Sequence, residues 1–410
     1  MFLGGIMYQN IVIESLDHYG RGIAHIDSKV VFVENALPDE IVDIEVTSSK
    51  KKFSLAKVVK YIKISPKRID SKCLYFGMCG GCNLLNLQYD NTLDFKLNKI
   101  RELLTKNRII YNGNFDVIEN KNKYNYRNKI SLKIVNGKIG FFQDKTHDLV
   151  MIDDCLVAHK VINKIIKNYK LLNVQNGELI VRVNSNDEVL LIIKSNDNNY
   201  DIELGKLKEL VKLVGIVYND KTIFGDNFFY ERVGGFLFKV SYNSFFQVNR
   251  YICEVLFNLI KDKVLEDDNV LDLYCGVGTL GIVASKKAKS VIGIEIIENA
   301  VLNGVFNAQI NKCNNIKFML GDVSKTVNKL NIEFDTLIVD PPRKGLDYNT
   351  IQFIKDNKFK KIIYVSCDPN TLMRDLKSLS DIYKIDEYKV LDMFSYSYHV
   401  ESFCLLEYVN

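Results

Sequence analysis

The chain lacks any apolar run approaching the roughly 20 residues that a helix needs to cross a bilayer. Its N-terminus has no basic segment ahead of an apolar one, as an export signal would have. These two absences exclude a helical membrane protein and predict a cytoplasmic location without a membrane partner. The chain also lacks internal repeats. With 410 residues, 47% hydrophobic and 26% charged, the composition predicts a globular protein of two or three domains.

Proline is scarce, and its few positions are informative. Only five prolines occur in the chain. Pro341 and Pro342 follow Asp340 directly, and Pro369 follows Cys367 at a distance of two residues. Because consecutive prolines stiffen the backbone, they are expected to hold the Asp340 carboxylate at the end of a strand.

Positive charge is modest overall and unevenly placed. The net charge is +5, yet the stretch Lys50–Lys72 contains eight lysines and Arg68 against the single acid Asp70. Such a stretch is either a solvated face or a surface for phosphate contacts. Its neighbour, residues 8–62, alternates strand-like runs with turns, as small oligonucleotide-binding barrels do. The combination favours RNA binding.

The nine cysteines do not suggest disulfides, because their number is odd and no export signal is present. Three of them, Cys73, Cys79 and Cys82, are separated by five and two residues. Cys155 is the candidate fourth ligand of a metal centre. This spacing fits a structural zinc and a 4Fe-4S cluster equally well.

The periodicity of apolar residues predicts three domains. Residues 1–62 form the small β-barrel, and residues 63–244 form a β-rich central domain that includes a helix over 93–107 and another over 159–172. From residue 245 to 410, strands alternate with helices, which predicts a Rossmann-like α/β domain.

A glycine loop predicts the cofactor site of the α/β domain. The segment 270–281 is a strand that breaks into glycines and opens a helix, and the next strand ends in Glu295, 19 residues after Gly276. In this arrangement the loop approaches a cofactor closely and the acid binds ribose hydroxyls. Gly276 and Gly278 are not the full dinucleotide fingerprint, so an adenosyl ligand without phosphates is favoured over NAD.

A β-branched and aromatic strand over 362–366 delivers Cys367 to the C-terminal edge of the sheet, where α/β proteins bind their ligands. A single cysteine in such a place is commonly a buried hydrophobe. Asp340–Arg343 lies upstream, however, and His399–Glu401 lies downstream. Polar clamp, thiol nucleophile and carboxylate base thus follow a cofactor loop in an order that one reaction could use.

These motifs together resemble the RNA (uracil-5-)-methyltransferase family. The resemblance rests on Asp-Pro-Pro-Arg-Lys-Gly at 340–345, Ser-Cys-Asp-Pro at 366–369 and His-Val-Glu at 399–401, and it extends over nearly the whole chain. It implies an N-terminal TRAM-type barrel, a central iron–sulfur domain and a Rossmann-like domain that binds S-adenosyl-L-methionine. In one departure, Ser395 follows Phe394 where the family often has proline, which puts the rigidity of that loop in doubt.

The resemblance also implies roles for individual residues. Cys367 would be the nucleophile and Glu401 the base; Phe245 and Arg343 would contact the substrate. The four cysteines would bind a 4Fe-4S cluster rather than zinc: Cys73, Cys79, Cys82 and Cys155. The cofactor positions would be Gln247, Tyr274, Thr279, Glu295, Asp322 and Asp340.

The chemistry explains these residue types. Uracil C5 is too weakly nucleophilic to accept a methyl group until a thiolate has added to C6. We therefore expect the surroundings of Cys367 to lower its pKa. A base must then remove the C5 proton, and Glu401 is preferred over His399. The target base has to leave the RNA stack to reach these groups.

The expected substrate is a uridine in 23S rRNA, with tRNA as the alternative, and the expected state is a monomer. Two other classes share part of the pattern. An exocyclic-amine methyltransferase has a similar strand-end Asp-Pro-Pro but needs no thiol. A non-catalytic RNA-binding iron–sulfur protein would use neither Cys367 nor a bound methyl donor.

Overall fold

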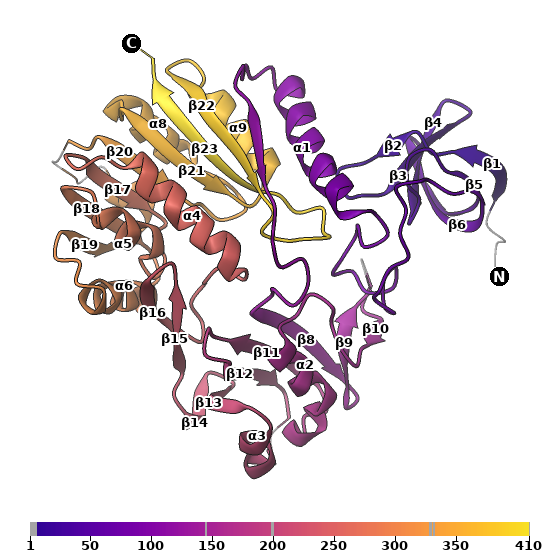
Figure 1. Cartoon of the computed structure of the whole chain (residues 1–410), viewed down its shortest axis with the longest axis horizontal. Coiled ribbons are helices and arrows are strands. Elements are labelled where there is room, and N and C mark those ends of the chain that lie inside the picture. The colour runs from indigo at the N-terminus through magenta and orange to yellow at the C-terminus, as the bar shows by residue number, and fades with distance from the viewer. Residues whose placement is uncertain (1–5, 144–145, 198–200, 328–329, 331–332, 410) are drawn as a thin grey trace. The chain divides into compact units, whose positions relative to one another are not determined.

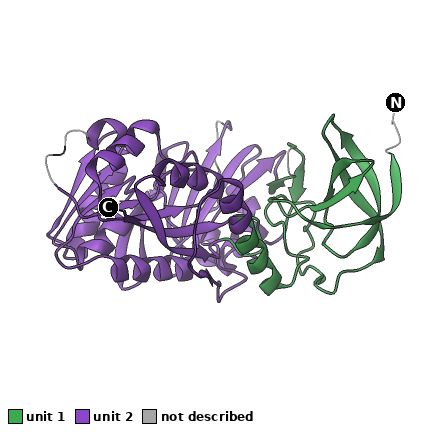
Figure 2. Ribbon diagram, turned by 90° about the horizontal axis from the view of Figure 1, so that it is seen from above, with its two compact units in different colours: residues 1–99, 140–152, 394–398 green, residues 100–139, 153–393, 399–410 purple. Residues whose placement is uncertain are grey.

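The computed structural model describes residues 6–143, 146–197, 201–327, 330 and 333–409. The chain forms two compact units, neither of which is continuous in sequence (Figure 2). Unit 1 comprises residues 1–99, 140–152 and 394–398, and unit 2 comprises residues 100–139, 153–393 and 399–410. The division into domains at residues 62 and 244 stays a prediction.

Unit 1 begins with a six-stranded sheet in the order β1-β5-β6-β4-β3-β2 (Figure 1). Alternate residues of these strands point to one hydrophobic core, which includes Ile13, Val33 and Ile44. The C-terminal half of β6 is mostly exposed and contains Lys57, Lys60 and Lys63. The strands are β1 Met7–Val12, β2 Ser15–Leu16, β3 Gly22–Ile26, β4 Lys29–Glu34, β5 Ile41–Ser49 and β6 Phe53–Lys63.

Two buried lysines of the helix α1, Tyr89–Lys106, hold the loop 394–398 in unit 1. Lys96 donates to the carbonyl oxygen of Phe394 at 2.8 Å, and Lys99 donates to that of Tyr398 at 3.0 Å. The loop is further fixed where the carbonyl oxygen of Tyr396 accepts the amides of residues 83 and 84, both at 3.0 Å. Lysine and backbone contacts therefore order a loop in which Ser395 replaces proline.

A mostly antiparallel sheet forms the first half of unit 2. Its strands follow the order β9-β8-β11-β12-β13-β14, and the end of β9 continues into unit 1, where it pairs with β10. The helices α2, Lys160–Lys167, and α3, Leu204–Leu210, contact β11 and β13 respectively. The strands are β8 Lys129–Val135, β9 Lys138–Phe142, β10 Leu149–Met151, β11 Gly177–Val183, β12 Glu188–Ser195, β13 Lys212–Tyr218 and β14 Lys221–Gly225.

The predicted helix over 159–172 is two elements. His159 is the N-cap of α2, its side chain accepting the amide of Val161, and α2 ends at Lys167. Asn168 then leads into a 3-10 turn, Tyr169–Leu172. Because a cap residue has non-helical backbone angles, His159 is not part of α2. The periodicity of apolar residues alone therefore predicted a helix that extends beyond both ends of α2.

Arg182 connects this sheet to the hairpin of β15, Phe228–Val233, and β16, Phe236–Ser241. Its side chain is buried, and Nη1 donates to the carbonyl oxygens of Ser241, Tyr242 and Ser244 at 3.0, 3.2 and 2.9 Å. Because one guanidinium satisfies three carbonyl groups, the turn that precedes Phe245 is held in one conformation.

The second half of unit 2 is an eight-stranded sheet in the order β19-β18-β17-β20-β21-β23-β22-β7 (Figure 1). The strands from β19 to β21 are parallel, whereas β23 is antiparallel to both of its neighbours. Its strands are β7 Phe115–Ile118, β17 Asn269–Leu273, β18 Ser290–Glu295, β19 Ile316–Leu320, β20 Thr336–Val339, β21 Lys361–Ser366, β22 Tyr383–Leu391 and β23 Glu401–Tyr408.

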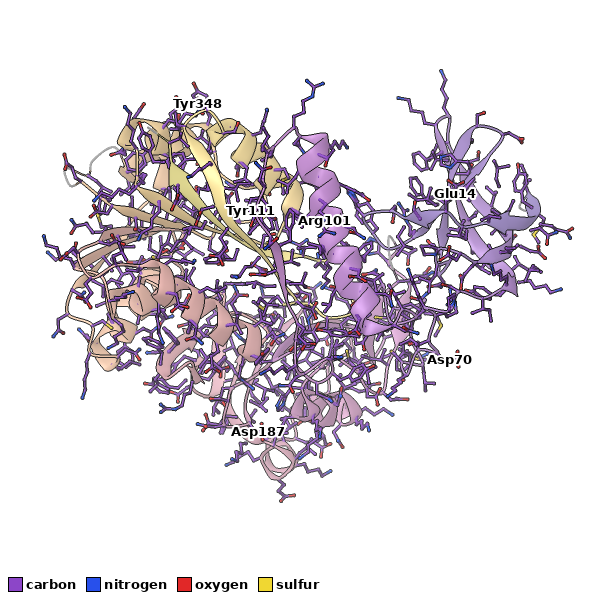
Figure 3. All side chains as sticks on the ribbon, turned by 45° about the horizontal axis from the view of Figure 1, so that its top comes forward. Glu14, Asp70, Arg101, Tyr111, Asp187 and Tyr348 are labelled. Atoms are coloured by element: carbon purple, nitrogen blue, oxygen red, sulfur yellow. The ribbon has the colours of Figure 1, made fainter. Side chains whose placement is uncertain are left out.

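Apolar side chains and helices bury this sheet. The central strands β17, β20 and β21 are almost wholly buried, as parallel strands covered by helices are. At the outer edge, Tyr111 packs edge-on against Phe115, and its hydroxyl accepts the amide of Tyr388 (Figure 3). The helices are α4 Arg250–Lys263, α5 Thr279–Ser285, α6 Glu298–Ile310, α7 Val323–Thr326, α8 Tyr348–Asn357 and α9 Pro369–Leu379.

In the parts of the chain that the structure describes, no helix is both long and apolar enough to span a membrane.

Candidate active site

Three residues selected from the sequence lie at one edge of the eight-stranded sheet. Asp340 directly follows β20, and Cys367 directly follows the parallel neighbour β21. Glu401 is the first residue of β23, which pairs Ser402 with Ser366 in antiparallel register. The next position outward on each strand is therefore Cys367 on one and Glu401 on the other. A thiol and two carboxyl groups meet where the strands end.

The backbone around Cys367 is fixed by the start of helix α9. Asp368 is the N-cap, and its carboxylate accepts the amides of Asn370 and Thr371 at 2.9 and 3.4 Å. The Ser366 hydroxyl accepts the amide of Asp368 at 3.2 Å. Capping by Asp with proline at the first helical position is a strong start signal, so the local sequence sets the place of the thiol.

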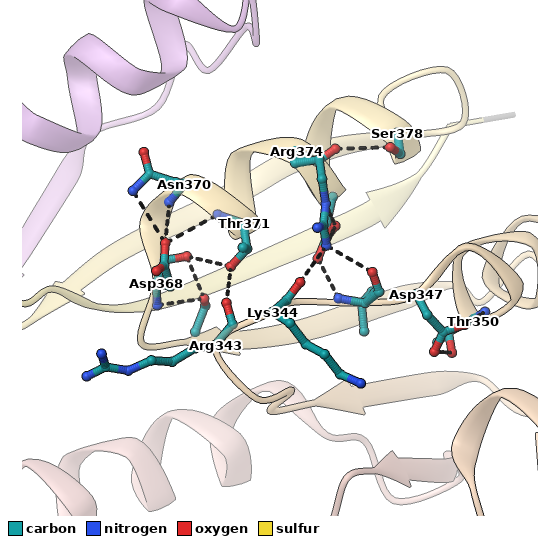
Figure 4. Close-up of polar contacts among 12 residues, drawn as sticks. Arg343, Lys344, Asp347, Thr350, Asp368, Asn370, Thr371, Arg374 and Ser378 are labelled. Atoms are coloured by element: carbon teal, nitrogen blue, oxygen red, sulfur yellow. Dashed lines mark hydrogen bonds and ion pairs between the residues drawn. The ribbon is translucent and has the colours of Figure 1, made fainter.

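The loop that carries Arg343 is attached to the same helix (Figure 4). The Thr371 hydroxyl donates to the carbonyl oxygen of Arg343 at 3.1 Å. Arg374 donates to the carbonyl oxygens of Lys344 and Leu346, both at 2.9 Å. The backbone of Arg343 is thus held by helix α9, whereas its side chain is exposed.

Two further residues of this support were not selected from the sequence. The buried carboxylate of Asp375 accepts the amide of Leu346 at 2.8 Å and the Tyr364 hydroxyl at 2.7 Å. Arg374 donates to the same carboxylate at 2.9 Å. Their only sequence signal is a polar pair among the other polar residues of an amphipathic helix, which does not reveal contacts to a loop about 30 residues away.

The expectation of a lowered thiol pKa for Cys367 is wrong for the protein alone. Burial, followed by the charges of Glu401 and Asp340 and against a lowering by Arg343, raises the pKa of Cys367 from 9.0 to about 11. The sequence showed which groups surround the thiol but not their distances. The two carboxylates outweigh the single guanidinium.

The two carboxyl groups oppose each other's ionisation. Burial raises the pKa of Asp340 from 3.8 to about 7. Burial, followed by the charge of Asp340, raises the pKa of Glu401 well above its ordinary value. Two neighbouring carboxyl groups in a poorly solvated site cannot both ionise easily, so a proton is retained by the pair near neutral pH.

The glycine loop between β17 and α5 has room for a cofactor. Gly276 and Gly278 have φ of +55° and +83°, which side chains with a Cβ rarely adopt. A Cβ on Gly278 would lie 2.6 Å from the ring of Phe318, whereas one on Gly276 would face open space. The loop can therefore approach a ligand closely at Gly276.

Glu295, at the end of β18, shapes this loop. Its carboxylate accepts the amide of Gly276 at 3.0 Å and those of Ile296 and Ile297 at 2.8 and 2.9 Å. Three amide donors fix the position of the carboxylate. A carboxylate fixed in this way retains lone pairs for ribose hydroxyls, so the loop and the acid fit an adenosyl cofactor.

The other predicted cofactor residues lie around the same sheet edge. Tyr274 has φ of +61°, and its hydroxyl lies 3.5 Å from the carboxylate of Asp347. Thr279 is the first residue of α5. Asp322 begins α7, and the Ser324 hydroxyl, which donates to it at 2.5 Å, lowers its pKa.

Asp272 is a buried acid that the sequence reading missed. It lies on β17 two residues before Tyr274, and burial raises its pKa well above the ordinary value. Within the described residues, its Oδ2 atom has no hydrogen-bond partner. The sequence signal that could have revealed it is an acid in the middle of an apolar strand, because burying an unpaired carboxyl group costs free energy.

The predicted substrate residue Phe245 is 65% exposed and lies in the loop that Arg182 supports. Gln247, two residues further on, is partly buried, and its carbonyl oxygen accepts the side-chain amide of Asn128 at 3.2 Å. Asn249 then caps α4. The structure therefore presents Phe245 to solvent on a backbone that is held on both sides.

The predicted metal centre is not shown. Cys73, Cys79, Cys82 and Cys155 are all partly buried, and the amide of Gly81 donates to Cys79 Sγ at 3.4 Å. The first three belong to unit 1 and the fourth to unit 2. Over the described ranges, no group of three or more His, Cys, Asp or Glu side chains is arranged to hold a metal ion.

Fold and site together define an S-adenosylmethionine-dependent methyltransferase. The parallel sheet, with a glycine loop after β17 and an acid at the end of β18, has the arrangement in which such folds bind adenosyl ligands. The chain is similar to the crystal structure of Pyrococcus abyssi tRNA (uracil-54, C5)-methyltransferase in complex with S-adenosyl-L-homocysteine. The TM-score is 0.81 and the sequence identity 27%, over 97% of this chain and 99% of that one.

The chain belongs to the tRNA (Uracil-5-)-methyltransferase family, whose model matches residues 88–409. The TRAM domain model matches residues 7–59, which confirms the predicted N-terminal TRAM domain of β strands. The protein is thus an RNA (uracil-5-)-methyltransferase that uses S-adenosyl-L-methionine. This decides against an exocyclic-amine enzyme and against a non-catalytic RNA-binding protein.

Bacterial relatives match over the same length. An uncharacterized RNA methyltransferase of Caldanaerobacter subterraneus subsp. tengcongensis is 34% identical over 96% of this chain and 97% of its own. One from Halalkalibacterium halodurans is 30% identical over 98% and 97%. The similarity therefore includes both the TRAM domain and the methyltransferase domain.

The raised pKa of Asp340 predicts that this residue destabilises the protein above neutral pH. Because its folded pKa lies above its unfolded value, its contribution to stability is present below about pH 4 and is lost as the pH rises through 7. We expect Asp340→Asn to be more stable than wild type at pH 8, by on the order of 1–3 kcal/mol, and to match it near pH 4. Denaturant unfolding at several pH values measures this.

Asp322→Asn is the matched control, because the pKa of Asp322 is lowered rather than raised. Its contribution to stability is present at neutral pH and is lost as the pH falls, so this variant gains nothing at pH 8. Equal pH dependence of wild type and Asp340→Asn would show that Asp340 is not held in a poorly solvated site.

Proposed function

We propose that the protein methylates C5 of a specific uridine in 23S rRNA through a covalent bond between Cys367 Sγ and uracil C6. The observation that carries the mechanism is the meeting of Cys367 and Glu401 at the paired ends of β21 and β23, beside Asp340. This strand pairing supports the proposal, because a nucleophile and a proton acceptor for the same base would then lie on neighbouring strands.

Cys367 begins the reaction. Its raised pKa means that the thiol stays protonated in the protein alone, so the thiolate forms only when the substrate is in place, and the thiol proton passes to water. Arg343, whose charge lowers that pKa, supports the thiolate at this stage. Addition of Sγ to C6 makes C5 electron-rich. S-adenosyl-L-methionine supplies a methyl group on a positively charged sulfur.

Glu401 ends the reaction. With the proton that the pair retains on Asp340, the C5 proton passes to the ionised carboxylate of Glu401, the C5–C6 double bond re-forms, and the Cys367 Sγ–C6 bond breaks. A carboxylate with a raised pKa is a stronger base than an ordinary one, which suits the removal of a carbon-bound proton. Gln247, Tyr274, Thr279, Glu295, Asp322 and Asp340 would hold the cofactor, and Phe245 would stack near the target base.

A 4Fe-4S cluster on Cys73, Cys79, Cys82 and Cys155 is a further part of the proposal. Its support is the spacing of the thiols and the amide of Gly81 donating to Cys79 Sγ, as amides do to cluster sulfurs. No catalytic step depends on it. Its role would be structural, because its ligands come from segments far apart in sequence.

The choice of RNA has two candidates. Ribosomal RNA is favoured by the basic stretch and the TRAM domain, which provide RNA-binding surface beyond the catalytic site. Transfer RNA is favoured by the similarity to the Pyrococcus abyssi tRNA enzyme, which covers the TRAM domain as well. That likeness weakens the argument from extra surface, so the substrate must be measured directly.

Deletion of the gene is expected to remove 5-methyluridine from one position or more of 23S rRNA. Nucleoside mass mapping of separated rRNA and tRNA from the deletion strain measures this loss, and complementation with wild type, but not Cys367→Ala, restores it. If only tRNA loses 5-methyluridine, the second candidate is correct.

Glu401→Gln is expected to stall after methyl transfer, because this variant keeps the nucleophile, the cofactor site and the side-chain shape and removes only the base. A labelled methyl group from S-adenosyl-L-methionine should migrate with a denatured protein–RNA complex in Glu401→Gln. Cys367→Ala should show no such complex. Accumulation in His399→Gln instead, or near wild-type turnover by Glu401→Gln, would transfer the base role elsewhere.

Anaerobically purified protein is expected to contain about four irons and four labile sulfides per chain. Cys82→Ser should lose them, whereas Cys313→Ala, at a buried cysteine outside the predicted cluster, should keep them. Metal and sulfide analysis measures both. Stoichiometric zinc without sulfide would contradict the cluster.

A further inference from the structure

We propose that a cavity in unit 1, referred to as the TRAM pocket, binds an unstacked nucleotide of the RNA substrate at a second place, apart from the methylated uridine. The proposal rests on the protein being an RNA methyltransferase. The cavity has a volume of about 380 Å³, which falls within the roughly 300–1,000 Å³ typical of small-ligand sites.

The TRAM pocket is lined by loops of the six-stranded sheet, by the cysteine-containing loop (residues 73–83), by the loop 394–398, and by Gln143, which follows β9. All of these segments belong to unit 1. The lining residues used here are Tyr19, Arg21, Glu34, Asn35, Asn83, Gln143 and Tyr398.

Two aromatic rings and a guanidinium form a wall of the TRAM pocket. The side chain of Tyr19 is 57% exposed, and its ring packs edge-to-face on that of Tyr398 with centroids 5.3 Å apart. The Arg21 guanidinium lies 5.4 Å from the centroid of Tyr19 and is fixed by Asp17, which accepts its Nε and Nη2 at 2.8 and 2.5 Å. Arg21 also lies 4.6 Å from the centroid of Phe32 and is largely buried, so it fixes the wall of the pocket, and the exposed ring of Tyr19 is the surface on which a single-stranded base can stack.

Charge in the TRAM pocket favours a base over a phosphate. The positive charge of Arg21 is already balanced by Asp17, and Glu34 adds a carboxylate to the lining. An anionic ligand would meet no net positive charge there. The amides of Asn35, Asn83 and Gln143 instead offer donors and acceptors that suit the edge of an uncharged base.

The pocket wall at Asn35 is rigid and continues into the basic stretch. The Asn35 carbonyl oxygen accepts the Tyr61 hydroxyl at 3.0 Å and Arg68 Nη2 at 2.6 Å. Gly77 has φ of +83°, and a Cβ there would lie 2.8 Å from Asn35 Nδ2, so glycine allows the cysteine-containing loop to approach. A base in the pocket would have its phosphates beside the lysines that surround Tyr61 and Arg68.

The TRAM pocket is distinct from the predicted cluster position. Only two of the four predicted cluster ligands, Cys79 and Cys82, line it. Residues 19–21 and 34–35 of the TRAM domain also line it. A cluster centred on four thiols does not account for a cavity that extends to Tyr19 and Asn35.

The test compares full-length wild type with Tyr19→Ala, Tyr19→Phe and His25→Ala. His25 is an exposed residue of the same sheet that pairs with Glu14, labelled in Figure 3. The probe is total RNA from the deletion strain. We expect Tyr19→Ala to raise the KM for RNA about tenfold, in line with the loss of one stacking contact, with kcat and the KM for S-adenosyl-L-methionine unchanged. Tyr19→Phe and His25→Ala should behave as wild type.

Ultraviolet cross-linking of wild type to the same RNA, followed by peptide mass spectrometry, provides a readout that needs no methylation. Nucleotide adducts are expected on peptides that contain Tyr19 or Tyr398. A KM for RNA within twofold of wild type in Tyr19→Ala, together with no adduct on these peptides, would overturn the pocket. Cross-links without any methyl transfer would overturn the proposed reaction and leave the pocket supported.

Discussion

The repulsion between two poorly solvated carboxyl groups, Asp340 and Glu401, is the constraint on which the site depends. Strand pairing places both beside Cys367 at the end of the sheet, and burial raises the pKa of all three groups. Such an arrangement opposes folding at neutral pH, so it persists only because the sheet below it is stable. In the proposed mechanism, the same arrangement keeps the thiol protonated until a substrate enters and makes Glu401 a stronger base for the last proton transfer.

Two supports hold this strained edge in place. Helix α9 fixes the backbone of the Arg343 loop through Thr371, Arg374 and Asp375. The guanidinium that lowers the pKa of Cys367 is therefore attached to a loop with a fixed backbone. On the cofactor side, Glu295 accepts three amides and shapes the glycine loop. Each support consists of side chains bonded to backbone groups, which positions a loop without relying on hydrophobic packing. Neither of these supports uses the side chains of Cys367, Asp340 or Glu401.

The sequence predicted much of this site because its signals are local. The strand before Cys367, the Asp-Pro cap after it and the acid at the end of β18 each follow from neighbouring residues, and parallel strands place their C-terminal ends together. The roles of Arg374 and Asp375 could not be predicted, because they contact a loop about 30 residues away. The predicted direction of the pKa shift of Cys367 was wrong, since the shift depends first on burial and then on the balance between two carboxylates and one guanidinium in space.

By itself the sequence determined the class of the protein: a TRAM-like β domain, a glycine loop followed by an acid 19 residues later, and a cysteine at the end of a strand with acids nearby in the motifs. These properties reside in residue types and short spacings, which chain order preserves. Only the tertiary structure decided how the acids act on the thiol, that buried lysines order the loop lacking proline, and that a pocket with aromatic and amide walls exists in unit 1. Those features arise from burial and from distances between remote segments, which no spacing along the chain encodes.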